Sequence, residues 1–429
     1  MQYYSLNNNA PKVVFSKAVI KGLAPDRGLY FPENITPLPQ SFFENIENLD
    51  NVEIAYEAIK QFVGDEIPET KLREILTDVL SFDFPVVQIE ENIGTLELFH
   101  GPTMAFKDVG ARFMARCLGY FNRNSENHVT VLVATSGDTG GAVANGFLGV
   151  RGVDVVILYP TGKVSEIQEK QLTTLGQNIT ALEVDGVFDD CQEMVKTAFL
   201  DTSITDHKQL TSANSINIAR WLPQLFYFLF AYKQIKNKGR DIVFSVPSGN
   251  FGNICAGIVA QKLGLPVKQF VASTNVNDTV VRYLKTSKYD PKPSKATISN
   301  AMDVGNPSNF IRIQKLFDHN FEELKNSFSA YSFDDYQTKK AMKKIYRETG
   351  YITDPHGAIG YLGLKEHDPN GNDYGIFLET AHPVKFLDVV EHTLDTTVEI
   401  PSQIQKVINK EKKSIPINGY EQLKEFLLA

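Results

Sequence analysis

The chain has 429 residues, of which 42% are hydrophobic and 22% are charged, and its formal net charge at pH 7 is −8. This length and composition are typical of a globular protein with two or three domains and exclude a chain that is mainly disordered. The acidic balance argues against a surface that binds nucleic acid or an anionic membrane. A small anionic substrate stays compatible with it, because a few local cations are enough to bind one.

The sequence shows no sign of a membrane span, a signal peptide or a metal site. The longest apolar stretch, residues 221–232, is interrupted by Pro223 and is shorter than the ~20 residues that span a bilayer. The N-terminus lacks the basic and apolar regions of a signal peptide. The three cysteines form no CxxC pair and no metal-like cluster. We therefore expect free thiols in a reducing cytoplasm and no bound metal.

Turn sequences dominate residues 1–90. Turns at 24–28 and 37–39 separate short apolar pieces, and residues 53–62 and 69–80 then have helical spacing. We predict a separate N-terminal domain here.

From residue 129 onward, short β-rich runs alternate with helical segments. The predicted strands are residues 129–134, 153–158, 178–184, 241–246, 267–273 and 374–378, and a long helix is predicted over 216–236. Near-continuous Val, Ile and Leu strands that alternate with helices are typical of a mostly parallel sheet buried on both faces. We expect an α/β fold of mostly parallel open sheets with helices on both faces. The ending at 406–429 is charged and helical in part, and we interpret it as an appended tail.

Lys107 lies in the segment FHGPTMAFKDVG, residues 99–110, where a helical pattern begins. A lysine that can lose its charge is a possible Schiff-base nucleophile. Its neighbours Ala105 and Phe106 favour a partly desolvated amine, and desolvation lowers the pKa of an amine. Most lysines are exposed and have no catalytic role, so Lys107 needs support from elsewhere in the chain.

A glycine-rich loop, PSGNFGN at residues 247–253, joins a predicted strand to a predicted helix. Glycines let backbone N–H groups approach a ligand closely, and the start of a helix favours an anion, so this loop fits a phosphate. It is neither a Walker A loop nor a GxGxxG motif. A turn needed only for tight strand-to-helix packing is an equally weighted alternative.

A second strand-to-helix turn, ATSGDTGGA at residues 134–142, is rich in glycine and hydroxyl groups. Thr135, Ser136 and Thr139 supply hydroxyls for an anion, and the helix start supplies N–H donors. Simple N-capping by Ser136 or Asp138 is the commoner role of such residues.

Lys163 and Arg220 are candidate cations for a substrate phosphate, since both side chains bind oxyanions. Both residue types are more often solvated surface residues, and Asn217 can equally be a cap. His356 and His382 suggest a Ser–His or metal site, but neither a GxSxG elbow nor an HExxH motif accompanies them. A structural role for the two histidines is favoured.

Taken together, these segments resemble the threonine synthases, pyridoxal-phosphate enzymes of fold type II, the tryptophan-synthase-β type. The resemblance spans nearly the whole chain and rests on MQYYS (1–5), KGLAPDRGLY (21–30), FHGPTMAFKD (99–108), TSGDTG (135–140), QEKQL (168–172), NSINIAR (214–220), SGNFG (248–252) and TAHP (380–383). It implies an N-terminal domain at 1–90, a catalytic region at 91–390 with a smaller inserted subdomain at about 108–215, and a tail at 391–429.

The resemblance also implies roles for individual residues. Lys107 would hold pyridoxal 5'-phosphate through a Schiff base and later act as acid and base, and Thr380 would face the ring nitrogen. The cofactor phosphate would be bound by Gly249, Asn250, Phe251, Gly252 and Asn253. The substrate region would comprise Thr135, Ser136, Thr139, Lys163, Asn217 and Arg220. Fold type II enzymes commonly have Asn where this chain has Asp138, so contacts known from Asn-type relatives do not carry over there.

The implied reaction converts O-phospho-L-homoserine and water to L-threonine and phosphate, by γ-elimination and β-addition of water, as the last step of threonine biosynthesis. Two phosphates in one site would account for two separate glycine-hydroxyl loops. A serine or threonine dehydratase is one alternative, since it would share Lys107 but need no second phosphate site. A catalytically silent homologue that binds the cofactor is another. We expect a cytoplasmic enzyme that is a monomer or homodimer, with this small-molecule substrate as its partner.

Overall fold

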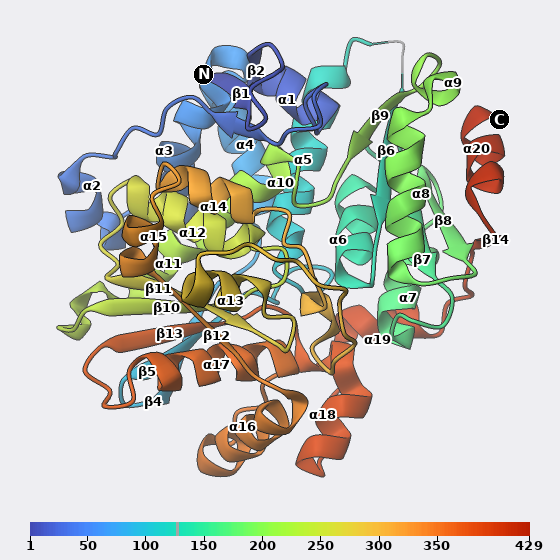
Figure 1. Ribbon diagram of the computed structural model, residues 1–429. Coiled ribbons are helices and arrows are strands. Elements are labelled where there is room, and N and C mark those ends of the chain that lie inside the picture. The colour runs from blue at the N-terminus through green and yellow to red at the C-terminus, as the bar shows by residue number, and fades with distance from the viewer. Residues whose placement is uncertain (126–127) are drawn as a thin grey trace.

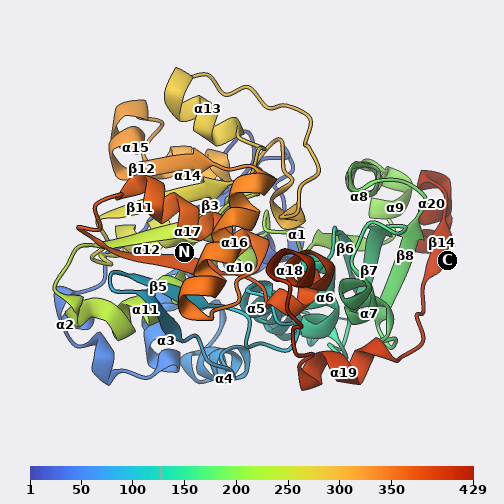
Figure 2. The same ribbon diagram turned by 90° about the horizontal axis from the view of Figure 1, so that it is seen from below.

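The structure is a computed structural model that describes residues 1–125 and 128–429. It contains a large sheet and a small sheet, which lie side by side and are each flanked by helices, and a short N-terminal sheet (Figures 1 and 2). The two larger sheets confirm the predicted α/β fold with mostly parallel strands.

The large sheet has six strands in the order β12-β11-β10-β13-β5-β4. They are β4 (Val86–Glu90), β5 (Ile93–Glu97), β10 (Ile242–Pro247), β11 (Gln269–Thr274), β12 (Phe328–Ser332) and β13 (Tyr374–Glu379). Only the edge strand β4 is antiparallel to its neighbour. The predicted strand at 374–378 is β13, and it lies in the middle of the sheet between β10 and β5. Helix α17 (Pro355–His367) covers one face, whereas α11 (Leu225–Ile235) and α12 (Gly252–Lys262) cover the other (Figure 1).

The small sheet has five parallel strands in the order β14-β8-β7-β6-β9. They are β6 (Val129–Ala134), β7 (Val153–Pro160), β8 (Ile179–Val184), β9 (Gln209–Ser212) and β14 (Ile415–Ile417). Successive β6 residues alternate between two clusters of the core: Val131 and Val133 pack with α6 (Asp138–Phe147), and Leu132 and Ala134 pack with α8 (Phe188–Leu200). Burial on both faces explains why these strands are apolar without alternation.

The C-terminal segment belongs to the small sheet. Helix α19 (Ser402–Ile408) packs on α7 (Glu166–Thr173), β14 pairs with β8, and α20 (Tyr420–Leu428) packs on α8 (Figures 1 and 2). The segment predicted as an appended tail therefore crosses from one sheet to the other and completes the second.

The N-terminal region contains the antiparallel sheet of β1 (Gln2–Ser5), β2 (Val13–Val14) and β3 (Tyr30–Pro32). Its helices are α1 (Phe15–Lys21), α2 (Gln40–Glu44), α3 (Asn51–Val63) and α4 (Glu69–Val79). Helices α3 and α4 correspond to the two predicted helices, and Asp50 caps α3 by accepting a hydrogen bond from the Glu53 N–H at 2.8 Å. Because β4 already pairs within the large sheet, that sheet begins before residue 90.

The predicted helix at 216–236 is broken by Pro223. It forms α10 (Ile218–Trp221), a short 3-10 turn at Leu222–Gln224, and then α11. Proline lacks the N–H that a continuous helix needs. Helix α11 is apolar almost all round because it is buried in the core. In the described part of the chain, no helix is long and apolar enough to cross a membrane.

The remaining helices connect or cover these sheets. They are α5 (Lys107–Asn122), α9 (Thr202–Thr205), α13 (Thr279–Thr286), α14 (Phe310–Leu316), α15 (Phe321–Ser327), α16 (Asp335–Thr349) and α18 (Leu387–Leu394). The carboxyl ends of the central strands, where ligands collect in open α/β sheets, carry most of the residues singled out in the sequence.

Candidate active site

Lys107 is the first residue of α5 and is held against the turn that follows β13. The backbone N–H of Phe106 donates to the Thr380 carbonyl at 2.8 Å, and the N–H of His382 donates to the Met104 carbonyl at 3.0 Å. These two hydrogen bonds bring together segments that lie more than 270 residues apart in the sequence. The structure thus joins the segment that carries Lys107 to the turn that carries Thr380.

The HGPT segment fixes the start of α5 through Asp108. The Thr103 N–H and hydroxyl donate to the two Asp108 carboxylate oxygens at 2.9 and 2.5 Å. Gly101 packs so closely that a Cβ there would lie 2.5 Å from Asp108 Oδ2. Burial raises the pKa of Asp108, although the hydrogen bonds from Thr103 oppose this shift. By fixing Asp108 in the first turn of α5, this segment also positions Lys107, the residue before it.

Burial and nearby charges set the protonation of Lys107. Burial lowers the pKa of Lys107 to about 8; Asp138 opposes this shift, whereas Arg220 and Lys385 add to it. The amine also lies 5.6 Å from the centre of the Phe106 ring. Because a neutral amine is the nucleophilic form, a pKa near 8 makes Lys107 reactive close to neutral pH.

The glycine-rich loop forms a tight connection between β10 and α12. A Cβ at Gly249 would lie 2.9 Å from the Ala301 carbonyl oxygen and from Met302 Cα. Phe251, which caps α12, has a positive φ of 60°, a left-handed conformation that non-glycine residues seldom adopt. Both polar atoms of the buried Asn253 side chain lack hydrogen-bond partners in the described structure. A buried amide without partners at a helix N-terminus indicates a missing polar ligand.

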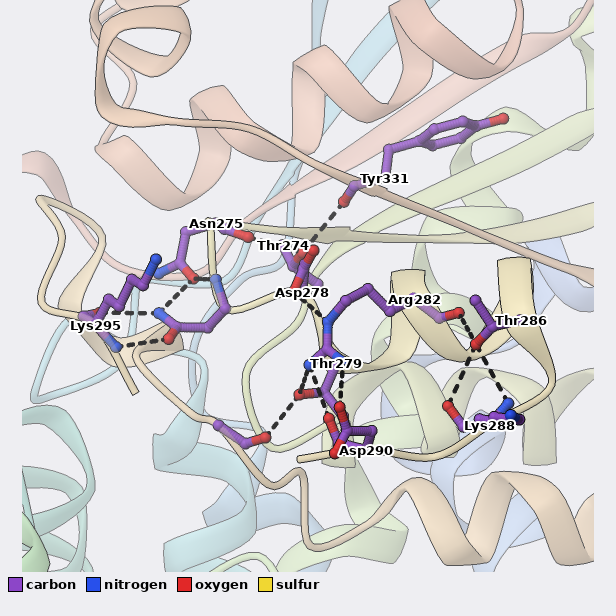
Figure 3. Close-up of polar contacts among 12 residues, drawn as sticks. Thr274, Asn275, Asp278, Thr279, Arg282, Thr286, Lys288, Asp290, Lys295 and Tyr331 are labelled. Carbon is purple, nitrogen blue, oxygen red and sulfur yellow. Dashed lines mark hydrogen bonds and ion pairs between the residues drawn. The ribbon is translucent and has the colours of Figure 1, made fainter. Parts of the chain in front are cut away.

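Residues 287–309 form the segment that packs on Gly249, and polar contacts anchor it (Figure 3). The Thr279 hydroxyl donates to the Gly305 carbonyl at 2.8 Å, and Arg282 forms an ion pair with Asp290 at 3.3 Å. Helix α13 thus holds both ends of the segment over the glycine-rich loop.

In the turn between β6 and α6, the Thr135 side chain bonds to the backbone of the same turn. The Thr135 hydroxyl accepts hydrogen bonds from the N–H groups of Gly137 and Gly140 at 3.0 and 2.8 Å. Ser136 and Thr139 are partly exposed. Ser136 and Thr139 are therefore better placed than Thr135 to bind a ligand.

The other three predicted substrate residues differ in their surroundings. Asn217 is fully buried and caps α10: its amide donates to the Val19 carbonyl at 2.9 Å, and its oxygen accepts from the Ala219 N–H at 3.0 Å. Arg220 is buried, donates to a backbone carbonyl, and has no partner for its Nε within the described residues. Burial lowers the pKa of Arg220 to about 10. Lys163 is exposed in the turn after β7.

Sequence reasoning missed Lys385. Its Nζ lies 2.7 Å from Asp138 Oδ1, and both side chains are almost completely buried. Gln168 donates to the same carboxylate oxygen at 3.0 Å. This ion pair joins the end of the large sheet to the first residue of α6 on the small sheet. The only signal in the sequence was the position of Lys385, five residues after Thr380 in the same turn.

Arg312 was missed as well, and it supports the substrate loop. Its buried guanidinium donates to the carbonyls of Ser215, Ile216 and Tyr30 at 3.2, 2.6 and 3.0 Å. It also lies 4.4 Å from the centre of a Trp221 ring. Arg312 therefore connects the N-terminal region to the segment that carries Asn217 and Arg220, through contacts that no sequence motif indicates.

The two histidines have structural contacts. His356 Nδ1 lies 2.8 Å from Asp354 Oδ2, and His382 Nδ1 accepts from the Val384 N–H at 3.1 Å. Burial lowers the pKa of His382 to about 4, so the ring is neutral at neutral pH. A search of the described residues finds no metal-binding group of three or more His, Cys, Asp or Glu side chains.

These features fit pyridoxal phosphate. Lys107 offers an amine that is readily deprotonated, the start of α12 offers N–H donors with the unpartnered Asn253, and Thr380 offers a hydroxyl in the turn that is bonded to the segment before Lys107.

Known proteins resemble the chain over its full length. It is 44% identical to a threonine synthase of Buchnera aphidicola over 431 residues, which cover 100% of both chains. The solved threonine synthase of Escherichia coli matches with a TM-score of 0.94 and 42% identity, covering 100% of this chain and 99% of the other. A threonine synthase from Brucella melitensis, solved with bound pyridoxal phosphate, matches with a TM-score of 0.92 and 33% identity, covering 100% and 98%.

Family models divide the same match along the chain. The model described as pyridoxal-phosphate dependent enzyme matches residues 93–375. With the fold and the site, it defines the chain as a pyridoxal-phosphate-dependent enzyme of fold type II. Models of the threonine synthase N terminus and C-terminal region match residues 2–79 and 357–427. The chain belongs to the threonine synthase family.

Proposed function

We propose that this enzyme converts O-phospho-L-homoserine and water into L-threonine and phosphate, with Lys107 as its acid–base residue. Membership of the threonine synthase family supports the reaction. The observation that carries the residue assignment is Lys107, whose buried amine has a pKa of about 8 and whose neighbour Phe106 is bonded through the backbone to Thr380.

The cofactor would be held at three points. Asn253 and the backbone N–H groups of residues 249–253 would bind its phosphate, Lys107 would bind its aldehyde group, and Thr380 would offer a hydroxyl to its ring nitrogen. When bound, pyridoxal phosphate supplies an electron sink that stabilises a carbanion at the substrate Cα. A neutral hydroxyl at Thr380 would leave the ring nitrogen largely unprotonated.

Lys107 then moves protons. Its free Nζ would take the proton from the substrate Cα and would serve the later transfers at Cβ and Cγ. A base is most effective when its pKa lies near the working pH, and the pKa of about 8 meets this condition. Asp138 and Lys385 surround this amine with fixed charges.

The substrate's acidic groups would bind between the two sheets. We assign its carboxylate to Ser136, Thr139 and the N–H groups at the start of α6, and its phosphate to Arg220. Thr135 and Asn217 hold the loops that present these groups, since their side chains are bonded to the backbone. Lys163 stays a prediction from the sequence.

Phosphate release tests this function. The purified, cofactor-loaded enzyme should release phosphate from O-phospho-L-homoserine, and Lys107→Ala should abolish this release. Lys365→Ala is a matched control, because Lys365 pairs with Glu90 at the opposite end of the large sheet and should leave the rate unchanged. Release of 2-oxobutyrate from threonine without phosphate release would identify a dehydratase instead and refute the proposal.

We further propose that the enzyme works in the cytoplasm as a monomer or homodimer. Cys117, Cys191 and Cys255 are all buried and free, which is typical of a reducing compartment. Light scattering of the protein as it elutes from a size-exclusion column measures the oligomeric state directly.

A further inference from the structure

Lys385 has a fixed position near Lys107. It lies in the short 3-10 turn Pro383–Phe386 that follows β13 and the Thr380 turn. The Lys385 N–H donates to the His382 carbonyl at 3.0 Å, and the ring of His382 caps the same turn. The Lys385 side chain has no exposed surface. A long, flexible and charged side chain that is completely buried needs an explanation, because lysine is almost never fully buried unless it is paired.

The pairing of Lys385 is incomplete. Its ammonium lies 2.7 Å from Asp138 Oδ1, but the described residues give it no hydrogen bond of normal geometry. An ammonium carries three N–H donors, so a single carboxylate oxygen leaves most of them unused. Asp138 does not interact with Lys385 alone, because the same carboxylate oxygen also accepts a hydrogen bond from Gln168. A buried donor that lacks an acceptor is costly, and native proteins rarely leave one without a functional reason.

The charged groups near Lys385 also have more positive than negative members. Arg220 and Lys385 both lie close enough to Lys107 to lower its pKa. Asp108, one of the two neighbouring carboxylates, is already bound by Thr103. Although burial raises the pKa of Asp138, Lys385 and Lys107 together hold it below its ordinary value, so Asp138 stays charged. Arg220 Nε has no partner among the described residues. This group of residues therefore has spare positive charge and spare donors.

We propose that Lys385 is a substrate-binding residue that donates hydrogen bonds to the phosphate of the substrate, which we assign to Arg220 as well. This inference rests on the proposed function, because it requires a substrate with a phosphate group. A phosphate has several strong acceptor oxygens and more than one negative charge. It can use the free donors of Lys385 while Asp138 keeps its own contact. A carboxylate would only repeat the single charge that Asp138 already supplies.

The position of Lys385 gives this contact a second consequence. Arg220 belongs to α10, Lys385 follows β13 of the large sheet, and Asp138 begins α6 on the small sheet. A phosphate bound by Lys385 therefore contacts the cation that already links the two sheets. Lys385→Gln removes this cation and should weaken phosphate binding, whereas the glutamine amide can still donate to Asp138 at the start of α6.

Binding of inorganic phosphate to the cofactor-loaded enzyme tests the proposal without requiring turnover. Loading fills the cofactor's own phosphate site, so that the probe reports the substrate's phosphate site. Calorimetric titration should show that Lys385→Gln weakens phosphate binding by about tenfold to hundredfold, the loss expected for a charged hydrogen bond. Lys385→Arg keeps the charge and should bind within about threefold of the unchanged enzyme.

Two controls separate this role from a structural one. Lys365→Gln makes the same change at a lysine remote from the site and should leave phosphate binding unaltered. L-Threonine, which carries the carboxylate but no phosphate, should bind to Lys385→Gln within about threefold of its original affinity. The absorbance of the bound cofactor should be unchanged in every variant, which shows that each one is folded and loaded.

Three results would overturn the proposal: no phosphate binding by the unchanged enzyme, equal phosphate binding by Lys385→Gln, or a loss of L-threonine binding as large as the loss of phosphate binding. Failure of the proposed function looks different. In that case O-phospho-L-homoserine releases no phosphate from the unchanged enzyme, while the titration with inorganic phosphate still gives its answer.

Discussion

At Lys107, burial and charge act on a single amine, and their balance decides its chemistry. Burial and the cations Arg220 and Lys385 favour the neutral form, whereas Asp138 favours the charged form. The motif around Lys107 indicated a reactive lysine, because Ala105 and Phe106 exclude water. The charges come from segments that are distant in sequence, so their effect on the pKa could not be predicted from that motif.

We predict that the rate at which pyridoxal phosphate is loaded onto the cofactor-free enzyme increases with pH, with a midpoint near pH 8. An ordinary lysine, whose pKa is 10.5, would give a midpoint near 10.5. Only the neutral amine attacks the cofactor aldehyde. Stopped-flow absorbance at a series of pH values measures the midpoint. Asp138→Asn removes the charge that raises this pKa, so it should move the midpoint to lower pH. A midpoint near 10.5 in the unchanged enzyme would show that Lys107 is not desolvated.

The same shift affects stability in a defined direction. The pKa of Lys107 is lower in the folded enzyme than in the unfolded chain, so the unfolded chain binds more protons between pH 8 and 10.5. The contribution of this group to the free energy of unfolding therefore increases as the pH rises through that window.

At the scale of elements, long apolar segments were predictable and several short strands were not. The strands predicted at 129–134 and 241–246 are β6 and β10 almost to the residue, because strands covered on both faces are continuously apolar. Strands β4, β5, β9, β12 and β14 of the two larger sheets were missed. They are only three to five residues long, and it is their pairing with neighbouring strands that defines them.

The start of α17 depends on a close contact that no helix pattern reveals. Glu379, at the end of β13, accepts from the Asp354 N–H at 2.6 Å and from the Thr353 hydroxyl at 2.8 Å. A Cβ added at Gly357 would overlap Glu379 Oε2. The glycine is required by the approach of the helix to the strand.

We predict that Gly357→Ala lowers the free energy of unfolding by about 1–3 kcal/mol, the usual cost of overpacking. Urea denaturation followed by circular dichroism measures it. Glu379→Ala removes the overlapping side chain, so that adding Gly357→Ala to it should cost less than in the original enzyme. The coupling in this double-mutant cycle should reach about 1 kcal/mol. Strictly additive effects would mean that Gly357 is not limited by Glu379.

At the scale of the whole molecule, the C-terminal segment holds the small sheet together. Ile417, Leu423 and Leu427 are buried in the cluster formed by β8 and α8. Lys412 forms ion pairs with Glu169 and Glu183, both at 2.8 Å. The division of the chain into 1–90, 91–390 and 391–429 stays a prediction. The last of these segments is joined to the small sheet by both packing and charge.

We predict that Leu423→Ala destabilises the small sheet by about 2–5 kcal/mol, the cost of a cavity in a core. Leu428→Ala is the matched control in the same helix: Leu428 is 42% exposed, whereas Leu423 is 0% exposed, and its replacement should cost no more than about 0.5 kcal/mol. Hydrogen exchange of the β8 and α8 amides reports the loss locally. Equal exchange rates in the two variants would contradict the packing of α20.

The sequence by itself determined the family, the cofactor and the α/β class, and it predicted Lys107 as the residue that binds the cofactor. These conclusions depend on local features, namely contiguous motifs and runs of apolar residues that indicate buried segments. Only the tertiary structure decided which charges surround Lys107, that Lys385 pairs with Asp138, that Asn217 is a cap and that the C-terminal segment is a strand of the small sheet. Each of these depends on contacts between segments far apart along the chain, and a contact of that kind leaves no pattern within either segment.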